Sequence, residues 1–346
     1  MRRAPVYLNV HAIVAVAVVC VTALAAGQEP SRSLLYSLEP GERILSSESE
    51  LALTLNATDV VLVTARGKGG QGPFFVLRDG ARKGPFASTN DAMAAAYAGR
   101  NNRREQHRDC AAYSPAPPPA GSEPAVNQEK GGQTLHFKGA TIGPHVMLLS
   151  HKVTPDGALV YAAAMDNDKA WFESSDGRKV SFGGTPVEFR FSPDGRHAAV
   201  RVDGRLGMSE MISLSKLPPE KAAEAVKDLE KKYIYAIDGK MFGPFDSIDS
   251  MWFPKTGNDL YFVVGDQLYR NGTAVPGVGS VNPCEFYPSP DGKSYARADY
   301  ESIRFSDGRK YPSPLNVGVY QDKGKVIYRW IALENNKDVV VYQRTM

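Results

Sequence analysis

The strongest concentration of positive charge in the sequence lies between Arg100 and Arg108. Five side chains in these nine positions are cationic or can become so: Arg100, Arg103, Arg104, His107 and Arg108. A run of this kind can bind an acidic partner or phosphate groups. No aromatic residue is interleaved for stacking on bases, so nucleic acid is not an expected partner. The run is the best candidate binding segment in the sequence, and a solvated loop is the alternative.

Two carboxylates, Asp166 and Asp168, flank Asn167 and could offer closely spaced oxygen ligands. Calcium prefers ligands of this type. An EF-hand loop would also need a glycine and a distal glutamate at fixed positions, and these are missing from the sequence. A polar turn between two strands is the alternative. No cofactor is predicted, although Ca²⁺ is one ion that this pattern could hold.

No combination of residues in the sequence specifies a catalytic site. No pair of histidines frames a glutamate as in the metalloproteases, and no serine lies in a complete Gly-x-Ser-x-Gly elbow. Ser213 and Lys216 fit the Ser-x-x-Lys pattern by spacing alone, and helix capping explains this serine better. We therefore predict no catalytic residue.

The N-terminus has the pattern of an export signal. Arg2 and Arg3 precede an apolar run that ends at Ala26, where small residues suit a signal peptidase. We assign residues 1–27 to a signal peptide and residues 28–346 to one mature domain, with an uncleaved anchor as the alternative. The expected location is periplasmic or secreted, with no membrane span after cleavage.

The three cysteines also relate to the predicted export, because disulfides form in oxidising compartments. Cys20 lies in the expected signal, which leaves Cys110 and Cys284 in the mature chain. An even number of cysteines in an oxidising compartment permits one disulfide. A bridge requires Cα atoms within about 7 Å of each other. Sequence alone does not establish that proximity, so two separate thiols are the alternative.

A recurring turn predicts the fold. Four segments place proline and glycine within a short turn between two apolar strands: 152–157, 190–195, 251–257 and 286–292. Proline presets φ at the start of such a turn, and glycine accepts the positive φ at its end. An Asp-Gly or Asn-Gly pair then closes a second hairpin. Two hairpins in each unit give a four-stranded antiparallel sheet.

The spacing of these units is that of a propeller. Pro155 and Pro193 lie 38 positions apart, and Pro254 and Pro290 lie 36 apart. The Ser-Pro-Asp-Gly hairpin after an aromatic strand resembles the WD40-like repeat of TolB and related bacterial exported proteins. This resemblance covers about residues 145–314. It implies an all-β fold, a β-propeller of four-stranded antiparallel blades.

Seven blades account for the chain. We expect them at 46–87, 88–144, 145–183, 184–246, 247–277, 278–314 and 315–346. The last has only three evident strands, so we predict that a strand at 33–38 completes it and closes the ring. An unattached leader strand is the alternative.

Two insertions interrupt the repeats. Residues 100–132 contain four prolines near their middle and are predicted to form a long irregular loop that replaces part of the second blade. Residues 213–232 are predicted to contain an inserted helix, with prolines at its start, acidic residues early and lysines late.

These features favour a binding scaffold over an enzyme. We expect a monomer that holds a protein partner or small ligand on one propeller face. The formal net charge is +3, and two of these charges lie in the expected signal, so no global field favours nucleic acid. A hydrolase or lyase with its site at the central channel is one alternative, because such sites draw residues from several blades. A propeller that binds calcium or a small ligand is another.

Overall fold

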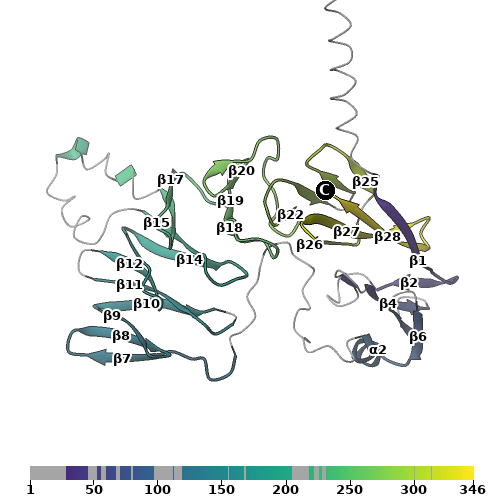
Figure 1. Ribbon diagram of the computed structural model, residues 1–346, viewed down its shortest axis with the longest axis horizontal. Helices are drawn as coiled ribbons and strands as arrows, with labels where there is room; N and C mark the ends of the chain where they lie inside the picture. Colours follow the sequence, from purple (N-terminus) through teal and green to yellow (C-terminus); the bar gives the residue numbers. More distant parts are fainter. Residues whose placement is uncertain are drawn as a thin grey trace, which may run out of the picture.

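Strands dominate the structure, which is a computed structural model. It describes the following residues: 29–45, 53–55, 60–67, 71–78, 81–96, 112, 119–154, 156–166, 169–204, 218–221, 226–227, 231–299, 301–312 and 314–346. The strands form seven antiparallel sheets, which we call blades 1 to 7 in chain order. Figure 1 shows the blades following one another along a curved array, with blades 7 and 1 side by side.

The first three blades differ in their number of strands. Blade 1 contains β2 (Glu42–Ile44), β3 (Leu53–Leu55), β4 (Val60–Arg66), β5 (Phe74–Arg78) and β6 (Ala81–Phe86). Blade 2 contains β7 (Ala125–Glu129), β8 (Gly132–Phe137) and β9 (Ala140–His145). Blade 3 contains β10 (Met147–Val153), β11 (Val160–Met165), β12 (Ala170–Ser174) and β13 (Lys179–Phe182).

The other four blades have four strands each. Blade 4 contains β14 (Thr185–Phe191), β15 (Ala198–Asp203), β16 (Lys232–Ala236) and β17 (Met241–Phe245). Blade 5 contains β18 (Ser250–Trp252), β19 (Tyr261–Val264), β20 (Gln267–Arg270) and β21 (Thr273–Ala274). Blade 6 contains β22 (Phe286–Pro288), β23 (Tyr295–Ala298), β24 (Ser302–Phe305) and β25 (Lys310–Pro312). Blade 7 contains β26 (Asn316–Asp322), β27 (Lys325–Glu334), β28 (Asp338–Thr345) and β1 (Ser31–Ser37).

The first strand of the chain completes the last blade. β1 pairs antiparallel with β28, from Ser31 opposite Gln343 to Ser37 opposite Asp338. Ser37 also donates a hydrogen bond to the Asp338 carboxylate over 2.7 Å. The predicted completion of the last blade by an N-terminal strand is therefore confirmed, and the seven sheets follow one another in the order of a seven-bladed propeller.

The Ser/Thr-Pro-Asp-Gly turns share one hydrogen-bond pattern. In blade 3, the Thr154 hydroxyl donates to Asp156 Oδ1 over 2.5 Å and accepts from the Leu159 N–H at 3.0 Å. Blades 4 and 6 repeat these bonds with Ser192 and Asp194, and with Ser289 and Asp291. The glycines that follow have φ between 64° and 67°: Gly157, Gly195 and Gly292. The motif therefore needs its hydroxyl, its carboxylate and its glycine together.

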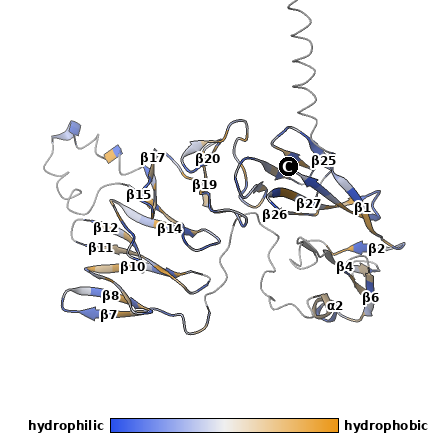
Figure 2. Ribbon diagram, viewed as in Figure 1, coloured by the Kyte–Doolittle hydropathy of each residue, from blue (hydrophilic) through white to orange (hydrophobic). Residues whose placement is uncertain are grey.

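Buried apolar clusters join six pairs of neighbouring blades: 2 and 3, 3 and 4, 4 and 5, 5 and 6, 6 and 7, and 7 and 1. The cluster between blades 6 and 7 includes the fully buried Trp330, which stacks on Tyr342 with ring centroids 5.1 Å apart. Figure 2 shows the strongly hydrophobic stretch of β27 that contributes to it. Within the described residues, no such cluster joins blade 1 to blade 2.

A helix takes the place of part of the expected second sheet. The second sheet was expected within residues 88–144, apart from the loop 100–132, but α2 (Thr89–Ala96) lies against blade 1, where Ala92 and Ala96 pack on Val63 and Val76. Ser88 caps the helix, because its hydroxyl accepts the Asp91 N–H at 3.1 Å. This Ser-x-x-Asp capping pattern precedes an alanine-rich run, a helix signal that competes with strand formation.

Two other boundaries differ from the predictions. Residues 125–129, inside the predicted irregular loop of 100–132, form strand β7 because the prolines end before it. Blade 1 begins at β2, before the expected residue 46. In the predicted helical insertion 213–232, the helical residues that the structure describes are 219–221 and 226–227.

Candidate functional site

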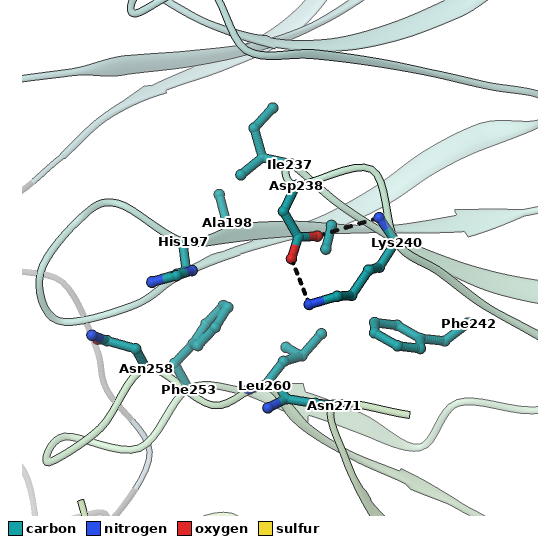
Figure 3. A pocket seen from close by; sticks show the side chains of 11 residues that line it. His197, Ala198, Ile237, Asp238, Lys240, Phe242, Phe253, Asn258, Leu260 and Asn271 are labelled. Atoms are coloured by element: carbon teal, nitrogen blue, oxygen red, sulfur yellow. Dashed lines mark hydrogen bonds and ion pairs between the residues drawn. The ribbon is translucent and has the colours of Figure 1, made fainter. Parts of the chain in front are cut away.

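A groove opens between blades 4 and 5, near the ends of the blades where their hairpin turns lie (Figure 3). Ile237 of blade 4 and Phe253 and Leu260 of blade 5 line it and are buried. Phe242 of β17 lies at one side. A concave apolar site bordered by a few polar groups is the usual form of a ligand site.

Polar side chains form the rim: His197, Asp238, Lys240, Asn258 and Asn271. Lys240 Nζ lies 2.8 Å from Asp238 Oδ2, and the Lys240 backbone N–H donates to Oδ1 of the same carboxylate over 3.2 Å. Figure 3 shows both contacts. Asn258 Nδ2 donates to Asp194 over 2.8 Å, a bond that ties the turns of blades 5 and 4 together.

The predicted hairpin turns position this rim. His197 follows the Ser-Pro-Asp-Gly turn of blade 4, and Asp238 opens the Asp-Gly turn between β16 and β17. Asn271 opens the Asn-Gly turn of blade 5 with φ of 48°. Its Oδ1 accepts the Leu260 N–H at 2.8 Å, which holds the edge of the groove in place. Turn residues chosen for backbone conformation therefore also become the polar border of the groove.

The charges at the rim compensate each other. Burial alone would raise the pKa of Asp238, but hydrogen bonds from Lys240 outweigh it and hold this pKa below its ordinary value. The same contact raises the pKa of Lys240. Both groups are therefore charged at neutral pH and form an ion pair beside the groove. An apolar floor beside a compensated ion pair suits an uncharged, apolar ligand group.

The structure does not test the predicted basic binding segment. Arg100, Arg103, Arg104, His107 and Arg108 all lie outside the described residues. The same holds for Ser213 and Lys216. The groove itself was not predicted, because its floor comes from two blades and its rim from four separate turns. The Asp-Gly and Asn-Gly pairs were the only sequence signal for its position.

Asp166, a candidate calcium ligand, is engaged by hydrogen-bond donors. Its carboxylate accepts the Trp171 indole N–H at 2.7 Å and the Val146 N–H at 3.2 Å, and His145 Nδ1 lies 3.1 Å away. Burial opposes these bonds, yet they hold the pKa of Asp166 below its ordinary value. The other candidate, Asp168, lies outside the described residues. Among the residues that are described, no group of three or more potential ligands is placed to hold a metal ion.

His145 connects blade 2 to blade 3. Its side chain is buried, and its Nδ1 faces Asp166 at the end of β11. On the other side of the ring, Nε2 lies 2.9 Å from Glu173 Oε1, and Lys179 pairs with the same carboxylate. Neither Nε2 nor this oxygen forms a hydrogen bond, so the two atoms make a close polar contact. An imidazole between two carboxylates is a polar link between these blades.

Cys284 is disulfide-bonded. Cys110, its predicted partner, lies outside the described residues, so this pairing stays a prediction. Ala112 is described: it forms an antiparallel bridge with Pro254 and packs against the cluster between blades 5 and 6. Cys284 lies in the connection between these two blades.

In the part of the chain that is described, no helix is both long and apolar enough to cross a membrane.

No family model and no curated protein matches the chain. Among solved structures it is similar to TolB from Acinetobacter baumannii, with 16% identity, 84% of this chain and 78% of that chain covered, and a TM-score of 0.27. The WD40 domain of Toxoplasma gondii coronin has 11% identity, coverage of 92% and 86%, and a TM-score of 0.29. Acylaminoacyl peptidase from Pyrococcus horikoshii has 12% identity, coverage of 88% and 52%, and a TM-score of 0.28. The assignment as a propeller rests on the order of the seven sheets and the strand that completes blade 7.

Proposed function

We propose that this protein is an exported binding scaffold whose groove between blades 4 and 5 holds one apolar side chain of a protein partner. The observation that carries the proposal is the apolar floor beside the Asp238–Lys240 ion pair. A buried apolar anchor within a polar border is the usual centre of a protein interface. Both blades are fixed by the cluster around Phe262, so the groove is largely preformed.

Two features support export. The first is the charged start and apolar run of residues 1–27. The second is the disulfide of Cys284, because disulfides persist in oxidising compartments. We further propose that the Arg100–Arg108 run contacts an acidic part of the same partner.

Site-specific photo-crosslinking tests the groove. A photoreactive residue would be introduced at Lys240 or at His197 in the full chain, which is then expressed in its own host and irradiated. We expect both positions to yield the same partner, with the crosslink mapped by mass spectrometry to the vicinity of one apolar residue.

The matched control position is Lys325, an exposed lysine that begins β27 just after the first hairpin turn of blade 7, at the same end of the blades. It should yield no adduct with this partner. Identical adducts from all three positions, or none from Lys240 and His197, would exclude the groove as the contact. Fractionation of the host cells tests export independently, since a protein retained in the cytoplasm contradicts that part of the proposal.

A further inference from the structure

Blade 2 has three described strands where most of the other blades have four. A motif shared with blades 1 and 4 identifies which of the four strand positions is without a described strand. Blades 1, 2 and 4 carry the motif in their last strand: Gly84-Pro85-Phe86, Gly143-Pro144-His145 and Gly243-Pro244-Phe245. Each glycine has positive φ, between 100° and 127°. A Cβ atom on it would lie within 2.7–2.9 Å of a carbonyl oxygen of the preceding strand. Gly72-Pro73-Phe74 also has a positive φ at the start of β5, but a Cβ atom on Gly72 would meet the Phe74 ring and not a carbonyl oxygen. The carbonyl contact thus marks the fourth strand, so β7, β8 and β9 are the second, third and fourth strands of blade 2.

The position next to β7 is therefore that of the first, innermost strand. All five residues of β7 are exposed, including Val126 with 45% of its surface accessible. Within the described residues, β8 is the one strand that pairs with it. A strand edge of this kind is a template for another strand.

The hairpin register shows which backbone groups are available. β7 and β8 are joined by a two-residue loop, with Glu129 opposite Gly132. The pair that flanks such a loop exchanges two hydrogen bonds, and bonded pairs then alternate along the hairpin. Val126 and Gln128 therefore direct their N–H and C=O groups away from β8. An incoming strand would meet these four groups.

The described residues of the connection before β7 contact other blades. Ala112 is bridged to Pro254 of blade 5, and Pro119 lies against Gly157 in a turn of blade 3. Between them, Pro115, Pro117 and Pro118 have no N–H to donate to a neighbouring strand. Residues 113–118 are therefore chemically unsuited to the innermost position, and residues 97–111 of the same connection lie outside the described residues.

We propose that the edge of β7 binds an extended segment of a protein partner, which adds to blade 2 as its innermost strand. The same molecule already completes blade 7 by adding a strand, β1, that is distant in sequence. On one side of the sheet the added strand would lie beside Val126 and the buried Leu135. On the other side it would lie beside Asn127 and the Glu129–His136 pair, whose atoms Oε1 and Nε2 are 3.4 Å apart.

The partner segment is thus one in which apolar and polar residues alternate, with the polar ones able to bond a carboxylate or an imidazole. This surface is separate from the groove between blades 4 and 5, and it does not depend on the function proposed for that groove.

The test uses the full chain and a displayed library of ten-residue peptides with alternating apolar and polar positions. In the free protein, the amides of Val126 and Gln128 should exchange rapidly with deuterium. A selected peptide should slow the exchange of these two amides. Gln128→Pro removes one N–H that would bind the peptide and should weaken binding by about tenfold. Gln128→Ala keeps that N–H and should bind like the wild type.

A second measurement leaves the protein unchanged. The selected peptide is N-methylated at alternate amides, in two versions that are out of phase with each other. One version should lose binding and the other should keep it, because only alternate amides face β7. Equal binding of both versions would overturn the proposal. Slow exchange of the Val126 and Gln128 amides in the free protein would also overturn the proposal, because it would show that the chain itself or a second copy already covers this edge. Dilution would speed the exchange only if a second copy covers it.

Discussion

Blades 7 and 2 each contribute three consecutive strands from their own stretch of sequence, but the two blades differ in how they are completed. β26, β27 and β28 are joined by β1, so β28 is paired on both edges. β7 is paired on one edge among the described residues. Blade 7 also shares apolar clusters with both of its neighbours, whereas blade 2 shares one with blade 3.

Each of the two blades also has a polar link to one neighbouring blade. Blade 7 binds blade 6 through Arg344, whose side chain is buried and forms two hydrogen bonds with the Asp307 carboxylate. Blade 2 binds blade 3 through His145, which lies between two carboxylates. One propeller thus combines a blade paired on both edges of its third strand with a blade whose second strand has one unpaired edge among the described residues.

Removal of β1 should have the largest effect. Deleting residues 31–37 strips one edge of β28 and leaves a long strand open to aggregation. We expect a loss of about 5 kcal/mol or more, comparable to the whole stability of many domains. Circular dichroism during heating and size-exclusion chromatography measure this. A truncated chain that stays monomeric and has the same melting temperature as the full chain would show that blade 7 does not need its fourth strand.

Substitution of one fully buried side chain at each of two blade junctions compares the packing of these junctions directly. Ile331 lies between blades 7 and 1, and Leu135 lies between blades 2 and 3. Ile331→Ala should cost about 4 kcal/mol and Leu135→Ala about 2 kcal/mol, because a three-stranded blade can relax around the cavity. Urea unfolding of both variants gives the two values. Equal losses would mean that blade 2 is held as rigidly as blade 7.

Asp307 should make the junction of blades 6 and 7 sensitive to acid. The hydrogen bond from Arg344 lowers the pKa of Asp307 below its ordinary value of 3.8, although burial opposes this. Its contribution is therefore complete above that ordinary value and is lost as the pH falls through the lower value of the folded state.

Asp307→Asn should cost about 2 kcal/mol near neutral pH, a figure reduced for solvent screening because a third of the carboxylate side chain is exposed. The difference in melting temperature between wild type and variant should shrink as the pH falls below 4. A difference independent of pH would assign the loss to packing instead.

Proline at the edge of β7 should have the smallest effect. Gln128→Pro removes an N–H that faces solvent, so we expect a cost below about 1 kcal/mol. Val341→Pro, in the centre of blade 7, removes a bonded N–H and should cost about 3 kcal/mol or more. Thermal unfolding of the two variants measures the contrast. A large loss for Gln128→Pro would show that this N–H is already bonded.

The turns were the part of the fold that sequence could specify. Pro-Asp-Gly segments, and the Pro-Lys-Thr-Gly segment of blade 5, fix backbone conformation locally, so the hairpins of blades 3 to 6 followed from residues a few positions apart. The place of β1 followed from one further argument, the cost of an unpaired edge. The helix α2 was missed because its signal, Ser88 with Asp91, is short and was outweighed by the expected strand period.

The groove could not be read from the sequence in the same way. Ile237 and Leu260 are 23 positions apart and meet because blades 4 and 5 pack face to face. Similarly, His145 of blade 2 meets Asp166 at the end of β11 and Glu173 of β12, which both belong to blade 3. Contacts of this kind depend on tertiary packing, which leaves no local pattern in one sequence.

The closure of blade 7 by β1 is the central structural claim, and one pair of cysteines tests it most directly. Ser33 lies opposite Val341 in the sheet. The account predicts that Ser33→Cys with Val341→Cys oxidises to a bridge that peptide mapping detects, while Ser33→Cys with Val339→Cys, two positions away, does not. Failure of the first pair to bridge, or equal bridging by both pairs, would contradict the closure.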